Sequence, residues 1–434
     1  MPEFSKKITG GIKISPEALS ETKKIKNLLG FKKIVEEKLS SEITDILETI
    51  FAGSISLEAS DLHIEPEEKK AKIRLRIDGI LQDIMTIEKE IYTALLSRIK
   101  LLSAIKFNIS DRPQDGRFSI VTEEALIEVR TSTLPSEYGE SIVLRILNPK
   151  SLIDLESLGL REDLLSLFKK EAKKPNGMII VTGPTGSGKT TTLYAFLKKI
   201  QNPEIKIITI EDPIEYHIEG ISQTQTNPSK GYDFANGLKS IMRQDPDVIL
   251  VGEIRDLETA EISLQAALTG HLVLTTLHTN DAAGTVIRLI SLGANLANIG
   301  PAINVAVAQR LIRKICRKCA KLQTASSQTL EKFKKEFKGV PREVSIPKIV
   351  SGIKIPKAAG CKDCNSTGYR GRIGIFEAFL VDDEMEKFIL KKPSIAELKE
   401  MAIKKGMVTM KQDGFIKVLE GITTIEEVEK ATGE

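Results

Sequence analysis

A glycine-rich segment in the middle of the chain has the spacing of a phosphate-binding loop. It reads Gly183-Pro-Thr-Gly-Ser-Gly-Lys-Thr190, follows the apolar run Met178–Val181 and precedes the helix-like TTLYAFLKKI. Glycines let successive backbone N–H groups curl around phosphates, while the lysine reaches the β and γ phosphates and the threonine hydroxyl binds Mg²⁺. Because the strand–loop–helix context is complete, we prefer this interpretation to a chance turn. The expected nucleoside triphosphate contacts are Gly183, Pro184, Thr185, Gly186, Ser187, Gly188, Lys189, Thr190 and Thr191.

Acidic residues follow two further strand-like runs. Glu211 and Asp212 come directly after ITI, and Glu253 follows VILVG. Many P-loop enzymes carry a Mg²⁺-binding Asp where this chain has Gly252, so the missing contact must come from water or from another acid. We expect Glu253 to activate the attacking water, Glu211 to be catalytic and Asp212 to bind the nucleotide, with one of the last two completing the Mg²⁺ shell. The alternative is that these acids cap the turns or helices that follow them.

Two of the four histidines lie in one stretch, Thr269–Asp281. His271 and His278 are seven residues apart at the two ends of a predicted strand, so simple alternation places them on opposite faces and they are unsuited to share one metal. His278 follows the carboxyl end of the strand, where ligands of parallel sheets bind, and is expected to sense a γ phosphate. His271 is a second catalytic candidate. The alternative for each is a hydrogen-bonded structural histidine.

The four cysteines form two CxxC pairs with none left over. Cys316 and Cys319 are separated by 41 residues from Cys361 and Cys364. This spacing is typical of a closed, four-thiolate Zn²⁺ site that stabilises structure rather than performing chemistry. The alternative is four buried thiols. A redox role would need a thioredoxin-like context, which the sequence lacks.

Charge is distributed unevenly along the 434 residues. The net charge is +4, residues 1–40 hold nine Lys and five Glu, and residues 316–364 hold 12 basic and 4 acidic residues. Both basic segments are either solvated surface or functional: the arm would attract anionic lipid or an acidic partner, and the insert would stabilise thiolates. The chain has no Trp and only 5% aromatic residues, so stacking surfaces for nucleic acid are scarce. We find neither a secretory signal nor a membrane-length apolar run, and we expect a cytosolic protein.

The elements that position these residues fall into two patterns. A helix over 41–51 and short strands near 71–77, 125–129 and 141–147 predict an α+β domain. From residue 177, buried strands at 178–181, 205–210, 248–251 and 272–277 alternate with helical stretches, which predicts a parallel sheet covered on both faces. The predicted organisation is a basic arm at 1–40, an α+β lobe at 41–150, a helical linker at 151–170 and an ATPase domain at 171–434, which includes the insert 316–364 with its own helix at 330–337 and C-terminal helices at 376–434.

Together these segments resemble the type II secretion and type IV pilus assembly ATPases, in the branch that carries both Cys pairs. The resemblance covers roughly residues 41–434. It rests on SDLHIEP (60–66), RIDG (76–79), RPQDGR (112–117), RTSTLPSEYGESIVLRIL (130–147), GPTGSGKTTTLY (183–194), TIEDPIEY (209–216), RQDPDVILVGEIRD (243–256), ALTGHLVLTTLHTND (267–281), AQRLIRKICRKC (308–319) and CKDCNSTGYRGRIGIFE (361–377).

The resemblance implies an α/β fold in which a RecA-like P-loop motor domain with a zinc-binding insert follows a smaller α+β, PAS-like domain. It implies a cytoplasmic, ATP-hydrolysing homo-hexamer that uses ATP, Mg²⁺ and structural Zn²⁺, and that is peripheral on the inner face of the plasma membrane. There it would power pilin or pseudopilin assembly through an inner-membrane platform protein. It also implies that Arg117 and Arg130 complete the nucleotide site, because a guanidinium stabilises charge on a transferring phosphoryl group. The alternative for these arginines is surface ion pairs.

One departure from the family pattern concerns docking. Larger members carry an extra N-terminal domain that docks on the platform, whereas about 40 residues precede the shared region here. We expect the basic arm, with apolar Ile25, Leu28, Leu29 and Phe31, to form a small amphipathic substitute. Two other functions stay open at this stage. One is a nucleic-acid-translocating or DNA-uptake motor, against the expectation that nucleic acid is not a partner, and the other is a catalytically weak scaffold.

Overall fold

The computed structural model describes residues 10–25 and 27–433, and the chain divides into two compact units. The first unit runs to Ser151 and includes the short segment Ala359–Arg370, and the second comprises Leu152–Ala358 and Gly371–Glu434. Among the helices of the described ranges, none has the length and apolarity that crossing a bilayer requires.

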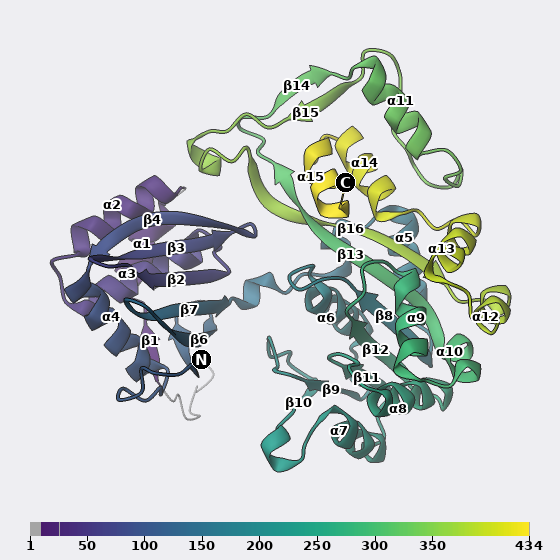
Figure 1. Ribbon diagram of the computed structural model, residues 1–434, viewed down its shortest axis with the longest axis horizontal. Helices are drawn as coiled ribbons and strands as arrows, with labels where there is room; N and C mark the ends of the chain where they lie inside the picture. Colours follow the sequence, from purple (N-terminus) through teal and green to yellow (C-terminus); the bar gives the residue numbers. More distant parts are fainter. Residues whose placement is uncertain (1–9, 26, 434) are drawn as a thin grey trace. The chain divides into compact units, whose positions relative to one another are not determined.

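The first unit is built on a mostly antiparallel sheet of seven strands, in the order β1-β5-β6-β7-β2-β3-β4. Strands such as β3 alternate between buried residues (Ala71, Ile73 and Leu75) and partly exposed ones, so only one face carries the apolar core. Helices α1–α4 pack against that face (Figure 1). The elements are β1 Gly11–Lys13, α1 Pro16–Lys23, α2 Leu28–Lys38, α3 Ile43–Ser56, β2 Asp61–Pro66, β3 Lys70–Ile77, β4 Ile80–Glu88, α4 Lys89–Leu102, β5 Gln114–Val121, β6 Leu126–Ser136 and β7 Gly139–Leu147.

The described part of the predicted N-terminal arm is folded into this unit, which therefore begins before the boundary predicted at residue 40, and the docking role of the arm stays a prediction. Strand β1 pairs with β5, and Asn27 caps α2 by accepting a hydrogen bond from the Gly30 N–H at 2.8 Å. Ile25 and Phe31 are buried in the core of the unit. Leu29 alone of the four apolar residues is strongly exposed, at 58%. On α2, Lys33 is exposed whereas Phe31 and Val35 are buried, so a basic segment can present an apolar side to the core.

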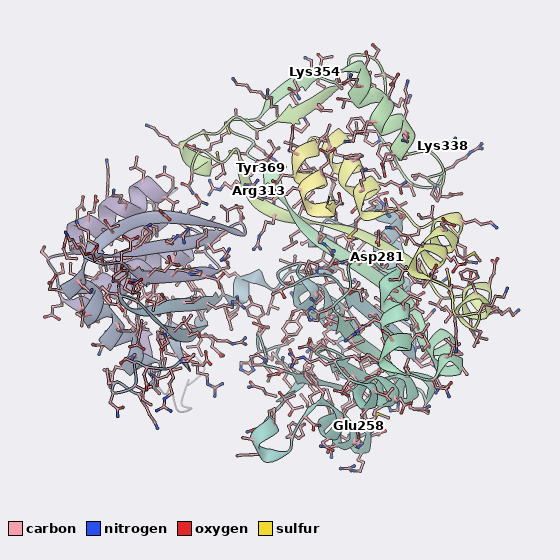
Figure 2. The ribbon with its side chains drawn as sticks, in the orientation of Figure 1. Glu258, Asp281, Arg313, Lys338, Lys354 and Tyr369 are labelled. Atoms are coloured by element: carbon pink, nitrogen blue, oxygen red, sulfur yellow. The ribbon has the colours of Figure 1, made fainter. Side chains whose placement is uncertain are left out.

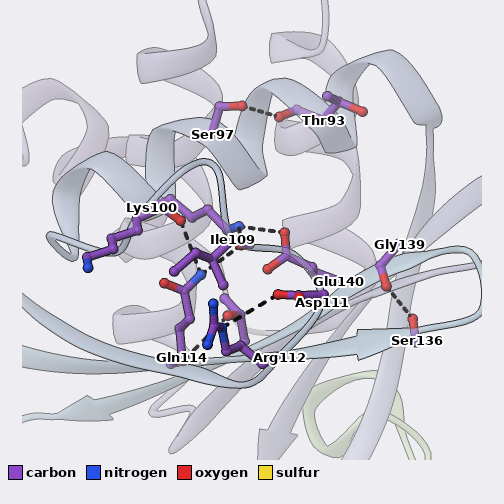
Figure 3. A network of polar contacts seen from close by, with 12 residues as sticks. Thr93, Ser97, Lys100, Ile109, Asp111, Arg112, Gln114, Ser136, Gly139 and Glu140 are labelled. Carbon is purple, nitrogen blue, oxygen red and sulfur yellow. Dashed lines mark hydrogen bonds and ion pairs between the residues drawn. The ribbon is translucent and has the colours of Figure 1, made fainter.

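A buried ion pair fixes the loop between α4 and β5 (Figure 3). Lys100 and Glu140 are both almost fully buried, and the ammonium lies 2.5 Å from the carboxylate. Lys100 also donates to the Ile109 carbonyl at 2.9 Å, and Gln114 donates to the same carbonyl at 2.8 Å. Tyr92 donates to the Glu140 carbonyl and accepts from its N–H, each at 2.9 Å. These contacts hold the chain as it enters β5, the strand that carries Arg117.

The second unit is built on a seven-stranded sheet in the order β10-β9-β11-β12-β8-β13-β16, whose pairings from β10 to β13 are parallel. Successive residues of β8 alternate between two cores: Met178 and Ile180 pack on one side, Ile179 and Val181 on the other. The prediction of a parallel sheet buried on both faces is therefore confirmed. The strands are β8 Gly177–Thr182, β9 Ile207–Glu211, β10 Ser222–Gln225, β11 Val248–Val251, β12 Leu272–Leu277, β13 Ile303–Ile315 and β16 Tyr369–Leu380.

Helices cover both faces of this sheet and follow it to the C-terminus (Figure 1). The helices are α5 Glu162–Glu171, α6 Lys189–Ile200, α7 Phe234–Ile241, α8 Leu257–Leu268, α9 Ala283–Leu292, α10 Leu296–Ala302, α12 Asp383–Ile389, α13 Ile395–Lys404, α14 Met410–Leu419 and α15 Ile425–Thr432. Segment 151–170, predicted as a linker, contributes Leu155 and Phe168 to the core that packs on one face of the sheet, so it is part of the unit. The prediction that the helical tail begins at 376 is also wrong, because β16 extends the sheet to Leu380 and the first helix after it begins at Asp383.

The insert between the cysteine pairs contains its own small elements. Strands β14 Lys321–Thr324 and β15 Lys354–Lys357 form an antiparallel two-stranded sheet, and helix α11 Ser327–Glu336 lies between them in sequence. The predicted helix is present, and it begins at Ser327 rather than Leu330 because Ser326 caps it by accepting from the Thr329 N–H.

Candidate functional site

The phosphate-binding loop joins the carboxyl end of β8 to the amino end of α6. Gly183 and Gly188 have φ values of +148° and +90°, which glycine adopts without strain. A Cβ on Gly183 would also lie 2.6 Å from the Gln309 carbonyl oxygen, so no other residue fits there. Pro184, Thr185 and Gly186 are exposed, and α6 begins at Lys189 with partly exposed Thr190 and Thr191 behind it. The loop thus presents its backbone at a helix amino terminus, which is where anions bind.

Gln309 supports the loop from the neighbouring strand and was missed by the sequence reasoning. It is buried on β13, donates to the Ser187 carbonyl at 2.7 Å and accepts from the Thr192 hydroxyl at 2.8 Å. One side chain therefore connects the loop to the first turns of α6. The available signal was an amide directly after the apolar run VAVA (305–308), since a buried polar residue needs partners.

The Lys189 ammonium contacts backbone carbonyls of the loop and is influenced by nearby charged side chains. Its ammonium donates to the carbonyls of Gly183 at 2.8 Å and Pro184 at 3.3 Å. Burial lowers the pKa of the Lys189 ammonium, the Glu253 carboxylate opposes that shift, and Arg310 adds to it. Arg310 on β13 was not singled out from the sequence. A second cation so close to Lys189 makes this end of the sheet attractive to an anion.

Glu253 and His278 meet at the carboxyl ends of β11 and β12. The His278 Nε2 lies 3.2 Å from one Glu253 oxygen, and Arg255 donates to the other at 2.5 Å. Gly252 precedes them where the backbone is crowded, because a Cβ there would lie 3.3 Å from the Glu211 Cα. The close approach of β9 to β11 thus leaves little room for a side chain at the position where many P-loop enzymes carry an Asp.

The two candidate acids after β9 differ in what they contact. Glu211 is 4% exposed, and its carboxylate accepts from the hydroxyls of Tyr194 and Thr209 and from the Gln223 amide at 3.2 Å. Burial raises the pKa of the Glu211 carboxyl, which these hydrogen bonds oppose. Asp212 is 38% exposed and lies 3.7 Å from Arg255. The structure therefore places Glu211 inside a polar network of the core and leaves Asp212 open to solvent.

The structure does not bring His271 to the phosphate loop of its own chain. Its Nδ1 lies 3.1 Å from the Ala266 carbonyl, and its own carbonyl accepts from the Gly177 N–H, where β8 begins. The loop follows the other end of β8, after Thr182. Six strand residues span roughly 20 Å, so His271 lies at the opposite end of the strands from His278. The two histidines therefore lie at opposite ends of β12, and only His278 is at the end where the phosphate loop lies.

The arginines singled out in the first unit belong to a longer row across its sheet. Arg117 on β5 lies directly opposite Arg130 on β6, and Arg130 lies directly opposite Arg145 on β7. Asp61 on β2 comes next and then Arg76 on β3. Asp61 is buried, accepts a hydrogen bond from Arg145 at 3.0 Å and forms an ion pair with Arg76 at 3.3 Å. Adjacent like charges in a sheet are unfavourable, and carboxylates of the same sheet offset part of this repulsion: Asp61 pairs with Arg145 and Arg76, and Glu128 lies 4.0 Å from Arg130.

The four cysteine sulfurs all lie within 4.8 Å of one another. All four residues are in the described part of the chain, and no disulfide joins them. The Cys361 and Cys364 sulfurs are 3.7 Å apart, and the N–H groups of Cys361 and Gly368 each point to the Cys364 sulfur at 3.2 Å. Cys316 and Cys319 come from a turn in which the Cys319 N–H donates to the Cys316 carbonyl. A tetrahedral metal 2.3 Å from each sulfur would separate them by about 3.8 Å, so this donor set fits one metal ion.

A family model described as "Type II/IV secretion system protein" matches residues 36–430. The chain belongs to that family. It is 43% identical over 399 residues to the type II secretion system protein E of Xanthomonas campestris pv. campestris, a match covering 91% of this chain and 68% of that protein. It is also 43% identical over 372 residues to the type IV pilus assembly ATPase PilB of Thermus thermophilus, which covers 86% of this chain and 41% of the relative.

Solved structures place this secretion-family chain among P-loop ATPases. The pilus retraction motor PilT with bound ADP aligns with a TM-score of 0.60 at 25% identity, covering 89% of this chain and 96% of that one. The Legionella pneumophila ATPase DotB aligns with a TM-score of 0.64 at 21% identity, covering 89% and 95%, and shows the shared fold. The predicted fold class, a P-loop parallel-sheet unit after a smaller α+β unit, is confirmed. These relatives give no support to the nucleic-acid motor that the sequence left open.

Proposed function

We propose that this secretion-family protein is an ATPase that works as a homo-hexameric motor and powers pilin or pseudopilin assembly. The observation that carries the proposal is the arrangement at one end of the parallel sheet, where Lys189, Glu253 and His278 surround an exposed phosphate-binding loop. A phosphate-binding lysine and a carboxylate that can orient water, at the carboxyl ends of parallel strands, suit phosphoryl transfer to water, and His278 is placed to contact a γ phosphate beside them.

Each residue of the site has a proposed part in the reaction ATP + H₂O → ADP + phosphate. The loop 183–191 and Lys189 bind the phosphates. Glu253 orients the attacking water and accepts its proton, and His278 contacts the γ phosphate while fixing the Glu253 carboxylate at 3.2 Å. Arg117 and Arg130 stabilise the charge that develops on the phosphoryl group. Glu211 keeps Tyr194 and the end of β9 in place rather than contacting the nucleotide, and His271 has no proposed catalytic part within its own chain.

Mg²⁺ fits the residues of this site. The Thr190 hydroxyl stands in the first turn of α6 and the Asp212 carboxylate is solvent-open, and both offer the oxygen ligands that Mg²⁺ prefers. Bound Mg²⁺ would neutralise charge on the β and γ phosphates. Because the Glu211 carboxylate is held by three donors inside the core, Asp212 is the proposed acid of the Mg²⁺ shell.

The four cysteines are proposed to hold one structural Zn²⁺. The site is closed, since four sulfurs fill a tetrahedral shell and leave no open position. Metal analysis of the purified protein tests this: one zinc per chain is expected, and Cys364→Ser should abolish stoichiometric zinc. Iron in place of zinc, or no metal, would contradict the assignment.

The motor's partners are proposed from its family. We propose a cytoplasmic protein, peripheral on the inner face of the plasma membrane, that docks on an inner-membrane platform protein. Light scattering of the protein with a non-hydrolysable ATP analogue should give six times the monomer mass, and a mass that stays monomeric would contradict the ring.

A direct assay tests the enzymatic part of the proposal. The purified chain should release phosphate from ATP in a Mg²⁺-dependent manner, and Lys189→Ala should abolish both release and binding of a fluorescent ATP analogue. Phosphate release that is unchanged in Lys189→Ala would mean that the activity does not belong to this site.

A further inference from the structure

The loop after His278 is held from three directions. Its Thr279 N–H donates to the Thr182 hydroxyl at 2.8 Å, which anchors it to the last residue of β8. The Asn280 carbonyl accepts from Arg310 at 2.7 Å. The Ala282 N–H donates to one oxygen of Glu377 at 3.0 Å, at the start of α9. The first two anchors belong to the walls of the phosphate site, whereas Glu377 comes from β16, far along the chain.

Glu377 is a buried carboxylate to which the proposed reaction gives no part. It is 2% exposed, and its second oxygen accepts from the Met410 N–H at 3.1 Å, at the start of α14. Each oxygen thus takes one N–H at the beginning of a ten-residue helix, where a negative charge is stabilised by the helix dipole. Burial raises the pKa of the Glu377 carboxyl, and the two N–H groups oppose that shift.

The surroundings of Glu377 connect the loop to the C-terminal helices. The residue before it, Phe376, donates its N–H to the buried Asp413 carboxylate of α14 at 2.7 Å. Asp281 of the loop, labelled in Figure 2, accepts from the Gly284 N–H at 2.8 Å and faces Lys399 of α13 at 3.9 Å. The His278 loop therefore contacts elements that pack with α13 and α14, and the Glu377 side chain bonds to both the loop and α14.

We propose that Glu377 is a positioning residue: its carboxylate fixes the Thr279–Ala282 loop and thereby the contact between His278 and Glu253. The inference rests on the proposed ATPase function of the same site. It does not make Glu377 a catalytic residue, since its two oxygens are occupied by backbone N–H groups of Ala282 and Met410.

The substitution Glu377→Gln tests this. It keeps the size of the side chain but leaves one good acceptor for two N–H donors. We expect kcat for ATP hydrolysis to fall about tenfold, the value of one lost hydrogen bond. The KM for ATP should stay within about twofold, because Lys189 and the phosphate loop are untouched. The matched control is Glu397→Gln, which removes an exposed carboxylate that accepts the Ser394 N–H at 2.7 Å at the start of α13. Its kcat should equal that of the unmodified protein.

A double-mutant cycle with His278→Ala separates positioning from general destabilisation. If Glu377 acts through His278, Glu377→Gln should lower kcat in the unmodified protein and have no further effect in the His278→Ala background. An equal loss in both backgrounds, or full kcat in Glu377→Gln, would overturn the inference. Thermal unfolding confirms that each variant is folded, and Glu377→Asp, which keeps the charge but is one methylene shorter, replaces Glu377→Gln in the cycle if the latter does not fold.

The proposed function is measured in the same experiment. If the unmodified protein hydrolyses ATP and Glu253→Gln does not, the ATPase function stands, and full kcat in Glu377→Gln then defeats the positioning role alone. A complete absence of ATP hydrolysis in the unmodified protein would overturn both proposals together.

Discussion

Seven strands build the sheet of each unit, yet the polar residues stand in different places on the two sheets. In the second unit both faces of the sheet are buried, and Lys189, Glu253 and His278 gather beyond the carboxyl ends of the strands. In the first unit only one face is buried, and Arg117, Arg130 and Arg145 lie side by side across the other. A parallel sheet buried on both faces can place reactive side chains only beyond the ends of its strands, whereas an antiparallel sheet can also present them on an exposed face.

The sequence specifies these two groups of residues, the one beyond the strand ends and the one in the arginine row, in different ways. Residues at the strand edge are close because several strands end together, so each can be recognised from its place after an apolar run. Residues in a cross-strand row are close because of pairing register, and a slip of one residue would move them to the buried face. We therefore expect the residues beyond the strand ends, which we call the edge group, to contribute most to the rate of ATP hydrolysis. The arginine row should make a smaller contribution.

Glu253→Gln tests the edge group and should have the largest effect. Loss of the base should lower kcat about 10³-fold, while binding of a fluorescent ATP analogue persists because the phosphate loop is intact. Phosphate release and analogue titration measure the two quantities. Loss of binding together with turnover would instead mean that Glu253 supports the loop.

Lys100→Met tests what holds the antiparallel unit in register. Removing the lysine leaves the buried Glu140 carboxylate without its charged partner, which should reduce the free energy of unfolding by about 3 kcal/mol. Chemical denaturation followed by circular dichroism measures the change. An unchanged unfolding midpoint would show that the pair is not needed, and Tyr92 with Gln114 would then suffice to hold the loop before β5.

Arg117→Ala tests the contribution of the row. We expect kcat to fall about 10²-fold, as for the loss of one donor to a developing charge, with little change in the affinity for the ATP analogue. The matched control is Arg112→Ala, an exposed arginine that pairs with Asp111 at 3.6 Å and lies outside the row. Equal turnover in the two variants would mean that the chemistry belongs to the strand edge alone.

Lys70→Met should have the smallest effect. Lys70 pairs with Glu88 at 2.9 Å in the same sheet, but both side chains are at least half exposed. We expect a change in unfolding free energy of about 0.5 kcal/mol or less, because solvent screens exposed pairs. A loss as large as that of Lys100→Met would show that exposure does not decide the value of such pairs here.

Much of the second unit was predictable from sequence because its signals are local. The phosphate loop and the acid after β11 have fixed spacings, and the buried strands read as continuous apolar runs. The beginning of the chain was misread for the opposite reason. Its lysines suggested a free arm, whereas Phe31 and Ile25 are buried against elements that follow much later in the sequence.

Within the site, the sequence by itself determined which residue types are present and on which strand or loop each one stands. It fixed a lysine and threonine at the start of a helix, a glutamate after one strand and histidines at both ends of another. Only the tertiary structure decided which of these residues meet. It brought His278 to Glu253 beside the loop and joined His271 to the Ala266 carbonyl at the other end of the strand. It also hydrogen-bonded Glu211 to Tyr194 and left Asp212 exposed to solvent. It also added Arg145, Gln309, Arg310 and Glu377. The physical reason is that strand order, register and burial depend on contacts between distant segments, which local spacing does not encode.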